Sequence, residues 1–83
     1  MTATLPTALT EYDVTKILLY VYCKANTDKE GLTDKEKIVV SLLRTKKIWG
    51  RVAETAYHDP LYLNIFLSLK EIADQFCRLT FSV

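Results

Sequence analysis

The chain has few of the residues that break regular secondary structure, with two glycines and two prolines among 83 residues. A sheet of several short strands needs tight turns, and glycine and proline supply many of them. Apolar residues make up 49% of the chain and charged residues 25%, which is typical of a folded domain and not of a disordered chain. The scarcity of turn residues therefore favours a single domain built from helices.

Residues that carry out chemistry are also scarce, with one histidine and two cysteines. Cys23 and Cys77 are too few and too far apart in the sequence for a zinc site, and we interpret them as buried free thiols, although an oxidising compartment would allow a disulfide. His58 precedes the helix-capping residue Asp59 and is interpreted as loop surface. No glycine-rich phosphate loop or nucleophile motif is present. We therefore expect no cofactor, no metal and no catalytic residue, and predict that the protein is not an enzyme.

A long hydrophobic run is absent. The longest apolar run, Ile17 to Cys23, has seven residues, whereas a helix that spans a bilayer needs about 20. The first residues lack the basic region and apolar stretch of a signal peptide. The formal net charge is +1, so no overall field attracts the chain to nucleic acid or acidic lipid. These observations predict a cytoplasmic protein with no membrane partner.

Periodicity and capping signals predict an all-α fold, a compact three-helix domain over residues 1–83. Thr10 with Asp13, and Thr33 with Glu36, have the spacing of capping boxes. Asp59 is a good N-cap, followed by a proline suited to the first helical position. The predicted segments are a flexible arm over 1–9, helices over about 11–25, 34–57 and 60–77, and an extended apolar tail over 78–83.

Two alternatives stay open at this point. Gly50 lies inside the second predicted helix, where glycine is unfavourable, so it marks a kink, a break into two helices or a close approach by a neighbour. The run 17–23 is rich in branched and aromatic residues, and it could instead form a strand that pairs with the tail 78–83, which alternates apolar and polar residues. The acidic first turn at Glu11 and Asp13 favours the helix.

Helical wheels separate core residues from apolar residues that a small core leaves uncovered. In the first helix the predicted core arc consists of Val14, Ile17, Leu18, Val21 and Ala25, and the opposite face carries Tyr12, Leu19, Tyr20 and Cys23. In the third helix the predicted stripe consists of Leu61, Ile65, Leu69, Ile72 and Phe76, widened by Tyr62, Phe66 and Ala73. Leu63 and Leu67 lie outside it. Two uncovered apolar patches indicate a partner-binding surface or a homo-oligomer contact. The alternative is that the tail or the N-terminal arm folds over them.

Basic residues share one face of the second predicted helix, where they could contact phosphates or an acidic protein surface. They are Lys37, Arg44, Lys47 and Arg51, and Glu36 and Glu54 partly neutralise them. Together these patterns predict a small non-enzymatic regulatory protein that binds a larger protein, such as a transcription regulator or a nucleic-acid-processing complex, and modulates its activity. Contact with nucleic acid would then be mainly indirect. The alternative is direct nucleic-acid binding through the basic residues.

Overall fold

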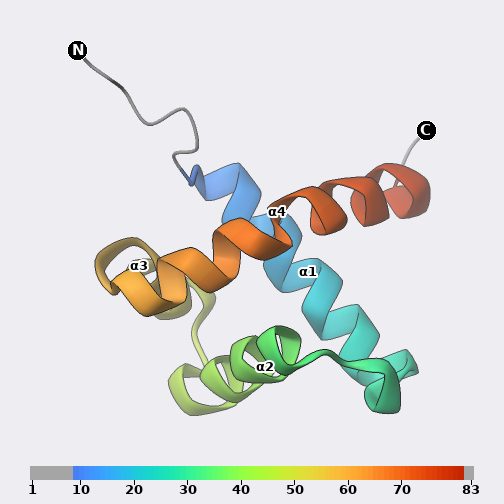
Figure 1. The fold of residues 1–83 in the computed structure, drawn as a ribbon, viewed down its shortest axis with the longest axis horizontal. Coiled ribbons are helices and arrows are strands. Elements are labelled where there is room, and N and C mark those ends of the chain that lie inside the picture. Colours follow the sequence, from blue (N-terminus) through green and yellow to red (C-terminus); the bar gives the residue numbers. More distant parts are fainter. Residues whose placement is uncertain (1–8, 82–83) are drawn as a thin grey trace.

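Residues 9–81 are described by a computed structural model of the chain. All secondary structure in that range is helical, which confirms the all-α prediction. In chain order the elements are α1 (Glu11–Thr27), the short 3-10 helix η1 (Lys29–Gly31), α2 (Asp34–Lys46), α3 (Trp49–His58) and α4 (Pro60–Phe81). The helix α4 crosses α1, while α3 lies beside the first half of α4 and α2 lies near the end of α1 (Figure 1).

The predicted starts of three helices are confirmed. Thr10 and Asp13 form a reciprocal capping box at the start of α1, with both hydrogen bonds 3.1 Å long. Thr33 and Glu36 form a second capping box at the start of α2. The Asp59 carboxylate accepts a bond of 3.0 Å from the backbone amide two residues later, in the first turn of α4. Each cap satisfies amides that the first helical turn leaves unpaired.

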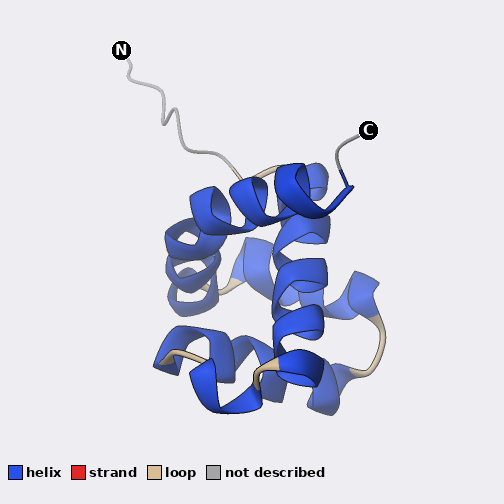
Figure 2. Ribbon diagram, turned by 90° about the vertical axis from the view of Figure 1, so that its right-hand side faces the viewer, coloured by secondary structure: helices blue, strands red, loops and turns tan. Residues whose placement is uncertain are grey.

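The strand alternative for residues 17–23 is wrong. These residues lie in the middle of α1, which continues two residues past its predicted end at Ala25. Figure 2 accordingly shows helices and loops over the part of the chain that is described. Branched and aromatic side chains are tolerated in a helix when packing covers them, and four residues of this run are buried.

The single helix predicted over 34–57 is divided into α2 and α3, so the described chain has four α-helices instead of three. The break lies at Lys47, the residue after α2, whose φ is positive at 67°. A break here lets Val52 and Ala56 turn into the core, where both are fully buried. Gly50 lies in the first turn of α3 with open space around its Cα, so it marks the neighbourhood of the break and not a close approach.

The extended tail predicted over 78–83 is wrong for the residues described, because α4 continues to Phe81. No residue between Pro60 and Phe81 interrupts a helix, and Arg78 forms an ion pair with Asp74 one turn earlier. The ring of Phe81 also packs edge-on against Phe76, with 6.4 Å between centroids. The alternation in the tail was too short to distinguish a strand from a helix.

The core lies where α1, α3 and α4 meet, with α2 closing one side. Its buried apolar residues are Leu9, Val14, Ile17, Leu18, Tyr20, Val21, Val39, Leu42, Val52, Ala56, Ile65, Phe66, Leu69 and Ala73. Four of the five residues predicted as the core arc of α1 are among them, and Ala25 is half-buried. Leu9 was assigned to the flexible arm but is buried, and the remainder of that arm lies outside the described residues.

Candidate functional site

Tyr20 joins α1 to α2 in a buried polar cluster, which corrects the prediction that it lies on an uncovered face. Its hydroxyl donates a hydrogen bond to the carboxylate of Glu36, which is 1% exposed. Lys24, one turn along α1, lies 2.9 Å from the same carboxylate. Phe76 of α4 packs edge-on against the Tyr20 ring, with 5.3 Å between centroids. The helical wheel of α1 alone could not predict this burial, because Tyr20 is covered by residues of two other helices, α2 and α4.

The charges in this cluster are matched to one another. Burial by itself raises the pKa of Glu36, but the hydrogen bonds from Tyr20 and the Thr33 amide and the charge of Lys24 outweigh it and lower that pKa. The hydrogen bond to Glu36 raises the pKa of Lys24, and burial raises the pKa of Tyr20. At neutral pH the carboxylate is therefore ionised and the phenol is protonated. The cluster connects helices and offers no free base or nucleophile.

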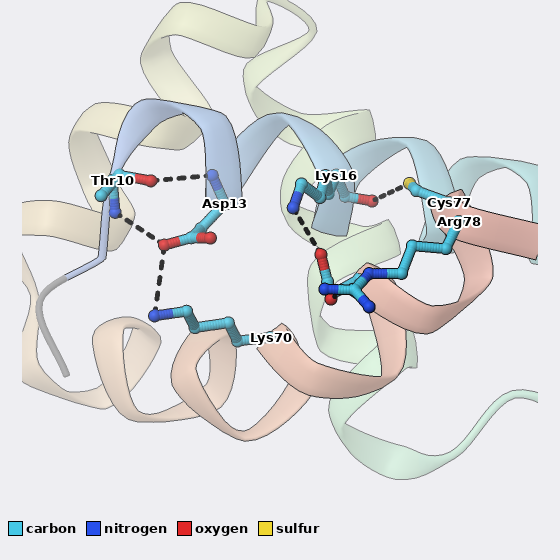
Figure 3. A network of polar contacts seen from close by, with 7 residues as sticks. Thr10, Asp13, Lys16, Lys70, Cys77 and Arg78 are labelled. Carbon is cyan, nitrogen blue, oxygen red and sulfur yellow. Dashed lines mark hydrogen bonds and ion pairs between the residues drawn. The ribbon is translucent and has the colours of Figure 1, made fainter. Parts of the chain in front are cut away.

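A second polar network lies along the contact between α1 and α4, and Figure 3 shows its side chains. Lys70 lies 3.4 Å from the carboxylate of Asp13. Lys16 pairs with one oxygen of Asp74, and Arg78 lies 3.1 Å from the other. Because each cation here faces a carboxylate, this side of the molecule has little charge left to attract a ligand.

Two of the predicted partner-binding residues lie next to this network. Tyr12 is 71% exposed and Leu19 is half-buried, and both line a groove between α1 and the end of α4, with Phe81 on the opposite wall. The Tyr12 ring also contacts the ammonium of Lys16, 4.2 Å from its centroid. Cys23, the fourth predicted residue on this face, is half-buried. Their role in binding a partner stays a prediction.

Some residues of α4 that were predicted to be exposed are covered, and some that were predicted to be buried are exposed. Leu63 and Leu67, predicted to be uncovered, are half-buried and pack against the core. Leu61 and Ile72, predicted as core, are 62% and 49% exposed. Phe66 takes the central position and is fully buried. The reason is that α1 crosses α4 at an angle, so the covered face of α4 changes along its length (Figure 1).

The predicted basic residues are all exposed, but they do not form one straight stripe. Lys37 and Arg44 lie on α2, Lys47 occupies the break and Arg51 lies on α3. None of the four takes part in an ion pair with any residue between 9 and 81. They are therefore free to interact with an acidic ligand, unlike the paired cations beside α4.

Between the end of α1 and α2 lies a shallow apolar groove bordered by several of these cations. It consists of two adjoining hollows, each about 230 Å³ in volume, which share Ala25, Val40 and Arg44. At one end Tyr22 of α1 and Trp49 of α3 stand edge-on to each other, with 6.5 Å between ring centroids. We call this the aromatic–basic groove, and define it by Tyr22, Ala25, Val40, Leu43, Arg44, Lys47 and Trp49.

The aromatic pair at this groove was missed by the sequence analysis. Tyr22 belonged to the apolar run 17–23 without a role of its own, and Trp49 lay inside the single helix predicted over 34–57. In the structure they are 54% and 37% exposed. Only the break at Lys47 brings Trp49 beside the end of α1. The signal that pointed toward it was Gly50, which raised the possibility of two helices.

The reactive side chains considered in the sequence are those of His58, Cys23 and Cys77. His58 is exposed at the end of α3. Cys23 and Cys77 are free and half-buried, and burial raises the pKa of the Cys77 thiol, which keeps it protonated and weakly nucleophilic. Over residues 9–81 no cluster of three or more histidine, cysteine and acidic side chains is arranged to hold a metal ion.

Comparison with known proteins does not add to these observations. The chain matches no protein family, and neither the curated proteins nor the solved structures gave a match. In the described part of the chain no helix has the length and apolar character needed to cross a membrane. The surface of the molecule is therefore the basis for inferring its function.

Proposed function

We propose that this chain is a non-enzymatic protein that binds a larger protein partner through the aromatic–basic groove and modulates its activity. The observation that carries the proposal is the exposed pair of Tyr22 and Trp49 beside Arg44 and Lys47, whose charges have no partner among residues 9–81. Tryptophan, tyrosine and arginine are the residue types that contribute most binding energy at protein interfaces.

The dimensions of the groove favour a protein ligand over a small molecule. The two hollows, about 230 Å³ each, are shallow and open to solvent, whereas small-molecule sites are usually clefts that bury most of the surface of their ligand. A shallow groove between two helices instead fits an apolar side chain or two from a partner's helix or extended segment. Val40 and Leu43 supply the apolar floor for such side chains.

The charge of the groove favours an acidic partner segment. Lys37, Arg44 and Lys47 border the groove, and all three are exposed. A partner segment with apolar side chains toward the floor and carboxylates along its edges would satisfy both features, and the charges would speed its association. Transcription regulators and nucleic-acid-processing complexes remain our proposed partner classes, because the same cations would lie near phosphates in such an assembly.

Direct nucleic-acid binding is the second candidate, favoured by the four exposed cations Lys37, Arg44, Lys47 and Arg51. The break at Lys47 distributes them over two helices, and no single helix presents them as a recognition helix would. Binding of duplex DNA or RNA by the isolated protein, weakening steeply with salt, would favour this candidate over the protein partner.

The proposal is tested by capturing partners from cells that express the protein and then measuring affinity for the captured protein. Trp49→Ala should weaken binding by at least about 30-fold, the effect of losing a tryptophan that contributes strongly to an interface. Tyr12→Ala is the matched control, because Tyr12 is an exposed aromatic residue on the α1–α4 side. Retained binding by Trp49→Ala together with lost binding by Tyr12→Ala would move the site to the face predicted from the sequence.

A charge reversal separates attraction from packing in the same experiment. Arg44→Glu should weaken binding by at least about tenfold, and more at low salt, because it places a carboxylate against an acidic partner. Lys46→Glu changes the charge by the same amount in the same turn of α2 but does not line the groove. Equal losses for the two variants would contradict a specific role for the groove.

A further inference from the structure

The apolar stripe of α4 continues beyond the part of the helix that the core covers. Tyr62, Ile65, Leu69, Ile72, Phe76 and Leu79 follow one another at steps of three and four residues, the spacing of helices that pack lengthwise. Ile65 and Leu69 are buried, whereas Ile72 is 49% and Leu79 is 88% exposed. The second half of α4 therefore presents a packing stripe that residues 9–81 leave largely uncovered.

The position of this half of α4 explains the exposure. Beyond its crossing with α1, the second half of α4 extends away from α2 and α3 (Figure 1). It contacts α1 through Asp74, which pairs with Lys16, and through Phe76, which lies on the edge of the stripe nearest α1 and packs against Tyr20. The side that carries Ile72 and Leu79 is thus accessible along about two turns of helix.

Charged residues beside the stripe indicate which kind of partner would fit it. Glu71 and Arg78 are exposed and seven residues apart, so they occupy the same side of the stripe. The Nε of Arg78 lies 3.1 Å from Asp74 of its own helix, which leaves the other N–H groups of this exposed guanidinium for a second carboxylate. When two identical helices pack antiparallel about a twofold axis, residues on the same side of each stripe face each other. With the axis near Gln75, Glu71 of each copy would lie opposite Arg78 of the other copy. This face of α4 is therefore apolar along the stripe, and its flanking charges are complementary to those of a second copy.

We propose that two copies of this chain associate through the second halves of their α4 helices, packed antiparallel about a twofold axis near Gln75. Ile72 of one copy then packs against Leu79 of the other, and two Glu71–Arg78 ion pairs border the contact. Such a contact is isologous, the commonest arrangement of homodimers. It uses none of the residues that define the aromatic–basic groove, so it is independent of the proposed function.

The size of the contact sets its strength. Stable dimers bury about 1,200 Å² or more, and a stripe two to three turns long buries less. The dimer is therefore weak and concentration-dependent.

The test measures molecular mass by sedimentation equilibrium between about 10 μM and 1 mM protein. The wild-type mass should rise from that of the 9.5 kDa monomer toward twice that value. Leu79→Ser should raise the dissociation constant at least about tenfold, because it removes the most exposed apolar side chain of the stripe. Leu61→Ser, an exposed leucine at the other end of α4, should leave it unchanged. A monomeric wild type at 1 mM, or equal effects of the two variants, would overturn the proposal.

A charge exchange tests the antiparallel arrangement. Glu71→Arg and Arg78→Glu should each weaken dimerisation about tenfold, because like charges then face each other. The double variant Glu71→Arg with Arg78→Glu should return to within about threefold of the wild type, since the opposite charges are again paired. Circular dichroism of each variant confirms that α4 is retained. Failure of the double variant to recover would exclude this pairing and with it the proposed packing.

Discussion

Two tyrosine hydroxyls show how differently the same group contributes when its partners differ. The Tyr20 hydroxyl donates to the buried carboxylate of Glu36. The Tyr57 hydroxyl is buried without a hydrogen-bond partner among residues 9–81, and burial, with Glu11 and Asp13 nearby, raises its pKa. A buried hydroxyl without a partner loses its hydrogen bonds to water on folding, so only the first hydroxyl should stabilise the protein.

Phenylalanine substitutions at these positions should therefore have opposite effects. Tyr57→Phe should leave the free energy of unfolding unchanged or raise it by up to about 1 kcal/mol, because no hydrogen bond is lost. Tyr20→Phe should lower it by about 2 kcal/mol, because the charged Glu36 loses a donor. Urea unfolding followed by circular dichroism measures both. Equal destabilisation would mean that the Tyr57 hydroxyl has a partner.

At the scale of the elements, the break between α2 and α3 depends on one residue with an uncommon backbone conformation. Lys47 has a φ of 67°, a region that residues with a Cβ adopt at an energetic cost and that glycine adopts freely. Its amide bonds to the Leu43 carbonyl 2.8 Å away, which ends α2. The turn directs α3 toward α1 and so brings Trp49 to the groove.

Glycine at this break should stabilise the protein. Lys47→Gly should raise the free energy of unfolding by about 0.5–1 kcal/mol. Glycine removes the energetic cost of the positive φ, and this gain exceeds the stability lost through the greater conformational entropy of the unfolded chain. Arg44→Gly, inside the last turns of α2, is the control and should lower it by about 1 kcal/mol. Thermal and urea unfolding distinguish the two. A loss of stability in Lys47→Gly would show that the lysine side chain contributes to the turn.

For the whole molecule, stability depends on a small core in which Phe66 is fully buried and central. Phe66→Ala should lower the free energy of unfolding by about 3–5 kcal/mol, since it leaves a cavity that neighbouring helices fill only in part. That is a large share of the roughly 5–15 kcal/mol of a typical domain. Leu61→Ala, exposed on the same helix, should change it by less than about 0.5 kcal/mol. Comparable unfolding midpoints for these two variants would contradict this description of the core.

The stability of the molecule should fall in acid. Burial alone would raise the pKa values of Glu36 and Asp13, but hydrogen bonds and nearby lysines outweigh it and lower both below their ordinary values of 4.5 and 3.8. A carboxylate with a lower pKa in the folded chain stabilises the fold above its unfolded pKa. That contribution is lost as the pH falls through the folded pKa.

The urea midpoint should therefore be highest above about pH 5 and decrease below pH 4.5. Glu36→Gln should be less stable at neutral pH and should lose less on acidification, because the titrating group is gone. Glu54→Gln, which removes an exposed carboxylate outside any ion pair of residues 9–81, should follow the wild type. A wild-type midpoint that does not change between pH 7 and pH 3 would contradict the role of these carboxylates.

Features that depend on neighbours in the sequence were predictable. The caps at Thr10, Thr33 and Asp59 are hydrogen bonds that span at most three residues, so their residue types and spacing suffice to identify them. The all-helical class followed in the same way from scarce turn residues and helical periodicity. The exposure of Lys37 and Arg51 was also predictable, because charged side chains are rarely buried without partners.

Features that depend on contacts between distant helices required the tertiary structure. The burial of Tyr20 depends on α2 and α4, the exposure of Ile72 depends on where α1 crosses α4, and the aromatic–basic groove depends on the turn at Lys47. A single helix specifies which residues share a face, but not which face another helix will cover. Capping and periodicity are local properties of the chain, whereas burial is decided by packing between segments far apart in sequence.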